Sequence, residues 1–400
     1  MSTGHVGTVE LLAGIAGVGR DRARGGYSRH LATPAESDLR DWFAEQAGRR
    51  GLDVETDRNG NVWAWWGTPG PDAVVTGSHL DSVPGGGAFD GPLGVASALA
   101  AVEDLVARGF APARPLAVVV FAEEEGGRFG VPCLGSRLLT GDLDADRARG
   151  LRDADGVSLA EALTARGDDP SALGPDPERL ARVGRFVELH VEQGRALDAP
   201  VGIGSAVVAH GRWRLTFTGQ GNHAGTTALT DRRDPMIPAA ATVLAARRAA
   251  ARVADARATV GRLVPNPGGT NVIASSVDLW LDVRIPAGEP GPVVEDVLGA
   301  ARAAADAEGC TVELGRESLS PAVAFDDALA ARLAAAVPGA PTLATAAGHD
   351  AGVLAAHAPA GMLHVRNPTG ISHAPQEHAE DDDVSHGARA LADVLAELAR

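Results

Sequence analysis

The chain has 400 residues, a formal net charge of −16 at pH 7 and 45% hydrophobic residues. This length is typical of two domains, and the hydrophobic content allows each domain a sizeable buried core. The acidic excess argues against nucleic acids and anionic membrane surfaces as partners, because both are bound through basic patches.

All 36 basic residues are arginine. The absence of lysine excludes a Schiff-base lysine and a phosphate-loop lysine, so an arginine or a metal must bind any anionic substrate. Cys133 and Cys310 are the two cysteines, which excludes a disulfide framework and a cysteine zinc cluster. Without a recognisable signal region or an apolar run of ~18 residues, we expect a cytoplasmic protein with no membrane segment.

The first 210 residues predict alternating helices and strands. Thr33, Pro34 and Glu36 have the spacing of a capped helix start. Apolar runs bounded by turn residues predict buried strands, and Asn59-Gly60 predicts a hairpin turn. The expected helices cover residues 7–20, 34–50 and 92–108; the expected strands cover 54–56, 62–65, 73–75, 116–121 and 186–194; and residues 141–184 are expected as a surface segment with a short helix at 159–164.

The pattern changes near Gly211. The next expected elements are a strand at 212–219, a helix at 235–254, two strands between 261 and 285, a helix at 292–308 and a strand at 311–314. This β-α-β-β-α-β order is that of a ferredoxin-like split unit. We therefore assign residues 211–320 to an inserted domain, with 1–210 and 321–400 forming the catalytic domain. The second part of the catalytic domain is expected to contain helices at 326–337 and 384–398 and strands at 342–346 and 361–365.

Polar residues follow three of the predicted buried strands. In open α/β sheets the carboxyl ends of the strands are where ligands bind. We interpret four of these side chains, together with His373 from the last part of the chain, as ligands of two divalent ions bridged by an aspartate, which lie about 3.5–4 Å apart in such sites. The proposed ligands are His79, Asp90, Glu125, His190 and His373. Zn²⁺ or Mn²⁺ suits them, and Co²⁺ or Ni²⁺ can take similar sites.

Two further acidic residues have expected roles beside the metals. Asp81 would hold the His79 imidazole in one tautomer. Glu124 would act as general base, taking a proton from the attacking water and passing it to the leaving nitrogen. The alternatives are a glycine-rich surface turn around His79 and a solvated acidic turn at Glu124 and Glu125.

Eight motifs occur in an order that resembles one family. They are His79-Leu80-Asp81-Ser82-Val83-Pro84, Asp90-Gly91, Glu124-Glu125-Gly126, Leu189-His190-Val191-Glu192-Gln193-Gly194, Asn222-His223-Ala224-Gly225-Thr226-Thr227, Gly269-Thr270-Asn271-Val272-Ile273, Gly348-His349-Asp350-Ala351 and Ile371-Ser372-His373. Over nearly the whole chain the sequence resembles the amidase/carbamoylase branch of the zinc-aminopeptidase-like metallohydrolases. That branch contains allantoate amidohydrolase, N-carbamoyl-L-amino-acid hydrolase and β-ureidopropionase.

The resemblance implies an α/β protein: a zinc-aminopeptidase-like catalytic domain with a mixed central sheet, plus an inserted ferredoxin-like α+β domain that serves as lid and dimerisation surface. It implies a homodimer in which His223 reaches the partner's active site and stabilises the tetrahedral oxyanion. It also implies that Arg284 binds the substrate carboxylate, with Gln193 and Asn271 as further polar contacts. From the residues alone, His223 is a turn residue and Arg284 a solvated charge.

We therefore expect a metal-dependent amidohydrolase that hydrolyses the N-carbamoyl group of a small carboxylate. Allantoate or an N-carbamoyl-L-amino acid is the favoured substrate. Arg366, an added cation before His373, raises the alternative of an N-formyl-L-amino acid such as N-formyl-L-glutamate. A metallodipeptidase is a second alternative, and a non-enzymatic binding module a third, against which the intact Glu124 argues.

Overall fold

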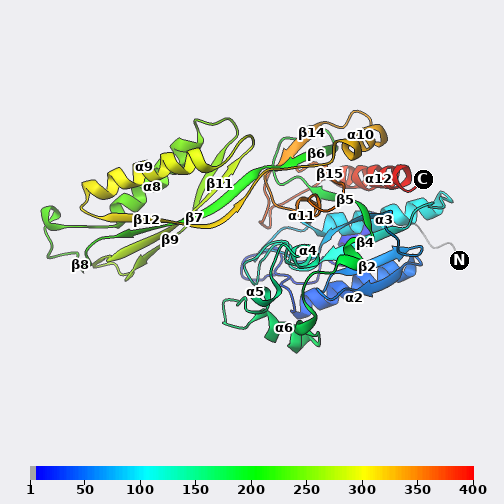
Figure 1. Cartoon of the computed structure of the whole chain (residues 1–400), viewed down its shortest axis with the longest axis horizontal. Helices are drawn as coiled ribbons and strands as arrows, with labels where there is room; N and C mark the ends of the chain where they lie inside the picture. Colours follow the sequence, from blue (N-terminus) through cyan, green and yellow to red (C-terminus); the bar gives the residue numbers. More distant parts are fainter. Residues whose placement is uncertain (1–5) are drawn as a thin grey trace. The chain divides into compact units, whose positions relative to one another are not determined.

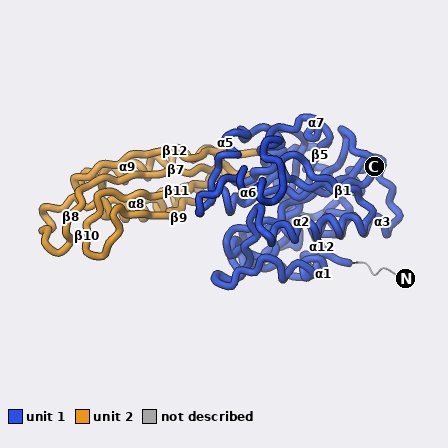
Figure 2. Tube along the Cα trace, turned by 90° about the horizontal axis from the view of Figure 1, so that it is seen from below, with its two compact units in different colours: residues 1–206, 324–400 blue, residues 207–323 orange. Residues whose placement is uncertain are grey.

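The computed structural model describes residues 6–400. The chain divides into two compact units, one formed by residues up to 206 together with Ala324–Arg400 and the other by Val207–Val323 (Figure 2). Each unit has its own β-sheet and its own hydrophobic core. Among the described residues, no helix combines the length and the apolar character needed to cross a bilayer.

The first unit is built on a nine-stranded mixed sheet of order β1-β2-β4-β3-β5-β15-β6-β13, with β14 paired to β6. The strands are β1 (Asp53–Thr56), β2 (Val62–Trp66), β3 (Ala73–His79), β4 (Leu116–Phe121), β5 (Val183–Val191), β6 (Val201–Val207), β13 (Val323–Ala324), β14 (Thr342–Thr345) and β15 (Ala360–Val365). The helices are α1 (Thr8–Gly14), α2 (Pro34–Arg49), α3 (Pro92–Ala107), α4 (Leu134–Thr140), α5 (Ala145–Arg149), α6 (Leu159–Arg166), the 3₁₀ helix η1 (Pro170–Ala172), α7 (Pro177–Leu180), α10 (Asp327–Ala336), α11 (Asp350–Leu354) and α12 (Asp381–Leu398).

The centre of this sheet is parallel. β4 pairs with β3, β3 with β5, and β5 with β15, all in parallel register. β3, β4 and β15 are buried along their whole length, as near-continuous apolar strands covered on both faces must be. The carboxyl ends of the four strands therefore lie at one edge of the sheet, as the sequence predicts for three of them.

Helices cover the sheet through a shared apolar core. This core contains four side chains with no exposed surface: Leu39 and Phe43 of α2, and Leu391 and Leu395 of α12. The same cluster contains the apolar residues of α3 and of the central strands. Complete burial of one such side chain contributes roughly 1.5–3 kcal/mol. This packing fixes the strand ends that carry the polar residues.

Three local predictions are wrong. Helix α1 ends at Gly14 rather than at residue 20. The expected capping box of α2 does not form, because the Thr33 hydroxyl donates to His30 O and Glu36 forms an ion pair with Arg166. The segment 141–184 is more than a surface excursion: α5 and α6 bury apolar side chains in a separate cluster that also includes Phe129 and Leu138.

The second unit confirms the ferredoxin-like order. Its antiparallel sheet has the order β12-β7-β11-β9, and α8 and α9 lie on the same face of that sheet (Figure 1). On β7, Trp213, Leu215 and Phe217 point into the core, as their alternation predicts. The elements are β7 (Ala209–Thr218), α8 (Met236–Ala250), β9 (Arg257–Asn266), β11 (Ser276–Ile285), α9 (Gly291–Ala307) and β12 (Thr311–Ser320), with a small β8 (Asn222–His223) and β10 (Val272–Ile273) pair and the 3₁₀ helix η2 (Leu229–Asp231).

Candidate active site

The parallel strands of the first unit bring five predicted ligands to one sheet edge. His79 is the last residue of β3, and His190 lies one residue before the end of β5. Glu125 follows β4, and His373 follows β15 in a loop where it has a left-handed φ of 56°. Asp90 lies in the turn that leads into α3.

Asp90 lies at the centre of this group. Its Oδ1 is 3.2 Å from His190 Nε2 and 3.7 Å from His79 Nε2. Its Oδ2 is 3.2 Å from His373 Nε2, which is also 3.3 Å from Glu125 Oε2. The two oxygens of one carboxylate therefore face two different groups of potential ligands, His79 with His190 and Glu125 with His373.

The tautomers of two histidines fit a bound cation. His79 Nδ1 is 3.1 Å from Asp81 O, and His190 Nδ1 is 2.9 Å from Val191 O. A carbonyl oxygen only accepts, so each Nδ1 carries a proton, and in the neutral imidazole the lone pair is then on Nε2. Among the described residues neither Nε2 has a hydrogen-bond partner, although each faces Asp90. Lone pairs facing a carboxylate oxygen at this range need a cation between them.

The charges of the site lead to the same conclusion. Burial lowers the pKa of His79 to about 4, whereas for His190 burial is outweighed by the contact with Asp90, which raises its pKa to about 9. Without a metal, His190 therefore holds a proton on the nitrogen that faces Asp90, and a bound metal cation would replace that proton. Burial and the charge of Asp90 raise the pKa of Glu125 to about 8. Burial and the surrounding carboxylates raise the pKa of Glu124 well above its usual value. So many buried acids in one place are costly unless cations neutralise them.

Asp81 and Glu124 lie where the sequence analysis expects them. Asp81 accepts hydrogen bonds from the backbone N–H groups of Glu124 and Glu125, both at 3.1 Å, and its Oδ1 is 3.6 Å from His79 Nδ1. Asp81 thus holds the acidic loop through its carboxylate and the His79 ring through its carbonyl oxygen, which lies 3.1 Å from Nδ1. Glu124 Oε2 is 3.5 Å from His79 Nε2, and Cys133 Sγ lies 3.5 Å from Glu124 Oε1.

Gln193 lies against the same centre. Its Nε2 is 2.9 Å from Asp90 Oδ2 and 3.2 Å from His373 Nε2. Its Oε1 has no hydrogen-bond partner among the described residues. An amide in this position can bind a polar group of a substrate.

Several supporting residues are missing from the sequence analysis. Glu377 Oε1 accepts from the N–H groups of Phe89 and Asp90, both at 2.9 Å, and Ser372 donates to Glu377 Oε2 at 3.2 Å. The segment around Glu377 carries no signal that could have revealed this role. Glu188 accepts a hydrogen bond from Ser78 Oγ at 2.8 Å. The sequence does carry a signal for Glu188, because a carboxylate inside an apolar strand, two residues before His190, indicates a supporting role.

His349 also lies beside the site, although its motif gave no role. Its ring centroid is 4.6 Å from that of His190, and Thr345 Oγ1 lies 3.3 Å from its Nε2. Glu188, His190 and His349 form a third cluster of potential ligand atoms. The buried ring of His349 packs against the His190 imidazole.

Three predicted substrate contacts lie in the second unit. His223 of β8 and Asn271 are adjacent, because Ala224 N donates to Asn271 O and His223 pairs with Val272. Arg284 is near the opposite end of the sheet, where its Nε lies 2.9 Å from Asp282 Oδ1. β11 begins at Ser276, next to the His223 end, and its nine residue steps to Ile285 span roughly 30 Å. His223 and Arg284 of one chain therefore cannot touch the same small molecule.

Arg366 does not contribute a second cation to the site. Its Nε is 2.8 Å from Asp383 Oδ2 of α12, and its Nη1 is 3.4 Å from Asp198 O. Asp383 neutralises this arginine, so the sequence-based reason for the N-formyl alternative is wrong.

Comparison with known proteins agrees with this geometry. The profile of the peptidase family M20/M25/M40 matches residues 75–397. An N-carbamoyl-L-amino acid amidohydrolase of Geobacillus stearothermophilus is 37% identical over 387 residues, which cover 94% of each chain. An allantoate amidohydrolase of Bacillus subtilis is 32% identical over 395 residues, again 94% of each chain.

A solved structure extends the match to three dimensions. The crystal structure of an amidase of the hydantoinase/carbamoylase family from Burkholderia vietnamiensis superposes with a TM-score of 0.85 at 30% identity, covering 100% of this chain and 99% of the other. Enzymes of the matched peptidase family depend on metal ions, in keeping with the ligand groups around Asp90. The chain belongs to the peptidase family M20/M25/M40 and, within it, to the amidase/carbamoylase branch that its motifs resemble.

Proposed function

We propose that this enzyme, a hydrolase of carbon–nitrogen bonds other than peptide bonds, removes the N-carbamoyl group of a small carboxylate. An N-carbamoyl-L-amino acid or allantoate is the substrate, and the products are ammonia, carbon dioxide and the free amine. The observation that carries the proposal is the Asp90 carboxylate, whose two oxygens face two separate groups of ligand atoms.

The ligand set supports two divalent ions per subunit, Zn²⁺ or Mn²⁺ before Co²⁺ or Ni²⁺. His79, His190 and Asp90 would hold one ion, and Asp90, Glu125 and His373 the other. When bound, such ions polarise the substrate carbonyl and make water a nucleophile at neutral pH.

Glu124 is the proposed general base. It is a buried carboxylate within 3.5 Å of a ligand histidine and belongs to neither ligand group. Burial and the neighbouring carboxylates raise its pKa, which increases the affinity of this carboxylate for the proton that it takes from the water. Glu124 accepts the proton of the attacking water and then donates it to the departing nitrogen.

His223 is the proposed donor to the oxyanion. Its Nδ1 accepts a hydrogen bond from Gly225 N at 3.1 Å, so the proton of the neutral imidazole is on Nε2. The side chain is exposed, which leaves this N–H free to meet a developing negative charge. Arg284 is the proposed partner of the substrate carboxylate, since its planar guanidinium can form two parallel hydrogen bonds.

A homodimer reconciles these two roles. Because His223 and Arg284 lie near opposite ends of a strand roughly 30 Å long, one small substrate can contact both only if they come from different chains. Apolar side chains on α8 support a subunit interface: Ile237 is 50% and Leu244 60% exposed. Exposed apolar patches of this kind mark protein–protein contacts.

A substrate panel tests the proposal. The metal-loaded protein is incubated with N-carbamoyl-L-amino acids, allantoate, N-formyl-L-glutamate and dipeptides, and ammonia, formate and free amino acids are measured. We expect ammonia from the first two classes, and a loss of about 10³-fold or more in Glu124→Gln with its metal content unchanged. Dipeptide cleavage without ammonia would indicate a peptidase, and formate without ammonia a deformylase; either result contradicts the proposal.

A further inference from the structure

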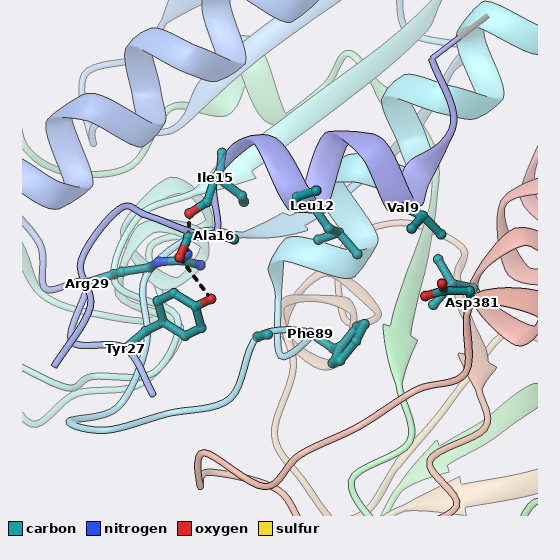
Figure 3. Close-up of a pocket in the computed structure, with 11 residues that line it drawn as sticks. Val9, Leu12, Ile15, Ala16, Tyr27, Arg29, Phe89 and Asp381 are labelled. Atoms are coloured by element: carbon teal, nitrogen blue, oxygen red, sulfur yellow. Dashed lines mark hydrogen bonds between the residues drawn. The ribbon is translucent and has the colours of Figure 1, made fainter. Parts of the chain in front are cut away.

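The first unit contains a cavity whose lining includes none of the proposed metal ligands. It has a volume of about 190 Å³ and lies between α1, the segment around Tyr27 and Arg29, the loop before Asp90 and the start of α12 (Figure 3). Its walls are mostly apolar, with Leu12, Ile15 and Phe89 among them. A dry cavity of roughly 150 Å³ is enough to bind a benzene ring, so this one has room for a small organic molecule.

One wall of the cavity carries a buried positive charge. Arg29 is 1% exposed, and its guanidinium lies over the Tyr27 ring at 3.9 Å. Its Nε donates to Val18 O at 3.1 Å and its Nη2 to Ile15 O at 3.0 Å, which leaves Nη1 without a hydrogen bond among the described residues. None of these partners is an acid.

The missing counter-charge is the unusual feature. Across residues 6–400 no carboxylate forms an ion pair with Arg29, whose titratable neighbours are Tyr27 and Arg20, and burial lowers the pKa of its guanidinium to about 10. Buried charges in proteins are normally paired, since an unpaired one is expensive to remove from water. The bonds to two carbonyl oxygens near the end of α1 offset part of this cost, and a ligand carboxylate would offset the rest.

We propose that this cavity binds a small carboxylate with an apolar body, whose charged end meets Arg29. Asp381 lies on the other side of the Phe89 ring from Arg29 (Figure 3), so repulsion orients the ligand with its carboxylate away from α12. The apolar body then packs on Leu12 and Phe89. Phe89 directly precedes the bridging Asp90, so the ligand touches the loop that carries the metal site without entering that site.

Benzoate is the test probe, because it combines one carboxylate with one ring. Isothermal titration calorimetry of the metal-loaded full chain is expected to show benzoate binding, with its neutral analogue benzamide about tenfold weaker or more, the size of a charge-assisted hydrogen bond. Leu12→Trp, which fills the cavity and leaves Arg29 in place, and Arg29→Met should each weaken benzoate binding by about tenfold or more. Arg20→Met is the matched control, because Arg20 also lies over the Tyr27 ring, at 4.7 Å, but does not line the cavity.

The variants also separate this site from the metals, which bind carboxylates themselves. Benzoate binding that survives Leu12→Trp unchanged lies elsewhere and overturns the proposal. Equal affinity for benzoate and benzamide, or no binding of either, overturns it as well. If Arg29→Met does not fold, Leu12→Trp and the benzamide comparison still decide the question.

Discussion

At the scale of single residues, Glu377 shows how a buried acid without a predicted role can organise the site. Its two carboxylate oxygens bind the backbone before Asp90 and the Ser372 hydroxyl beside His373. One side chain therefore fixes the bridging carboxylate relative to a ligand from the other end of the chain. Residues that orient metal ligands contribute strongly to metal affinity.

Replacing Glu377 with alanine tests this role. We expect Glu377→Ala to weaken metal affinity by about 10–100-fold, the usual effect of removing such a support, while the fold is kept. Metal affinity is measured by competition with a chromogenic chelator. Glu380→Ala is the control, since the Glu380 side chain is 57% exposed and forms its ion pair with the exposed His378, away from the ligand groups. Equal affinities in the two variants would show that Glu377 does not position the ligands.

The sequence predicted the ligands more readily than their supports. His79 is the last residue of an apolar strand and His190 the last but one, and that local pattern alone indicates a site at the sheet edge. The hydrogen bond from Phe89 N to Glu377 joins residues 288 positions apart, and no local pattern encodes such a contact. His223 differs again, because the residues around it predict only a turn, and the role in oxyanion binding came from the family resemblance alone.

At the scale of elements, strands were easier to predict than loop-rich segments. β4 is a run of six buried apolar residues, and this pattern predicted a buried strand directly from the sequence. In segment 141–184, aspartate, arginine, glycine and proline obscure the few apolar residues, such as Leu143 and Leu159, that belong to one buried cluster with Phe129. Whether an apolar residue of segment 141–184 is buried depends on the residues of other segments that pack against it.

Helix α3 approaches β5 so closely that one of its residues must be glycine. A Cβ on Gly94 would lie 2.3 Å from Leu189 O and 2.8 Å from Ser78 Cβ. We expect Gly94→Ala to destabilise the protein by about 1–3 kcal/mol through overpacking of the strand that carries His190. Gly48→Ala in α2 is the control: nothing lies within 4 Å of its Cβ, so the change should stabilise by up to ~1 kcal/mol. Urea unfolding measures both, and equal midpoints would contradict this account of the packing.

At the scale of the whole molecule, the inserted unit was recognisable from the order of its elements. A β-α-β-β-α-β series folds into few arrangements, and the observed sheet order β12-β7-β11-β9 is one of them. What the order could not reveal is that His223 and Arg284 lie near opposite ends of this sheet, because that separation follows from strand lengths and register. Their separation is the structural support for an active site shared between two chains.

Two inactive variants can test whether the site is shared. Glu124→Gln and His223→Ala subunits carrying different tags are co-expressed, and the mixed dimer is purified through both tags. If His223 acts on the partner's site, the site of the His223→Ala subunit keeps its own Glu124 and receives an intact His223, so the mixed dimer should show about half of the wild-type activity. Each variant alone should be nearly inactive. If His223 serves its own subunit, both sites of the mixed dimer lack one group, and an inactive mixed dimer would refute the shared site.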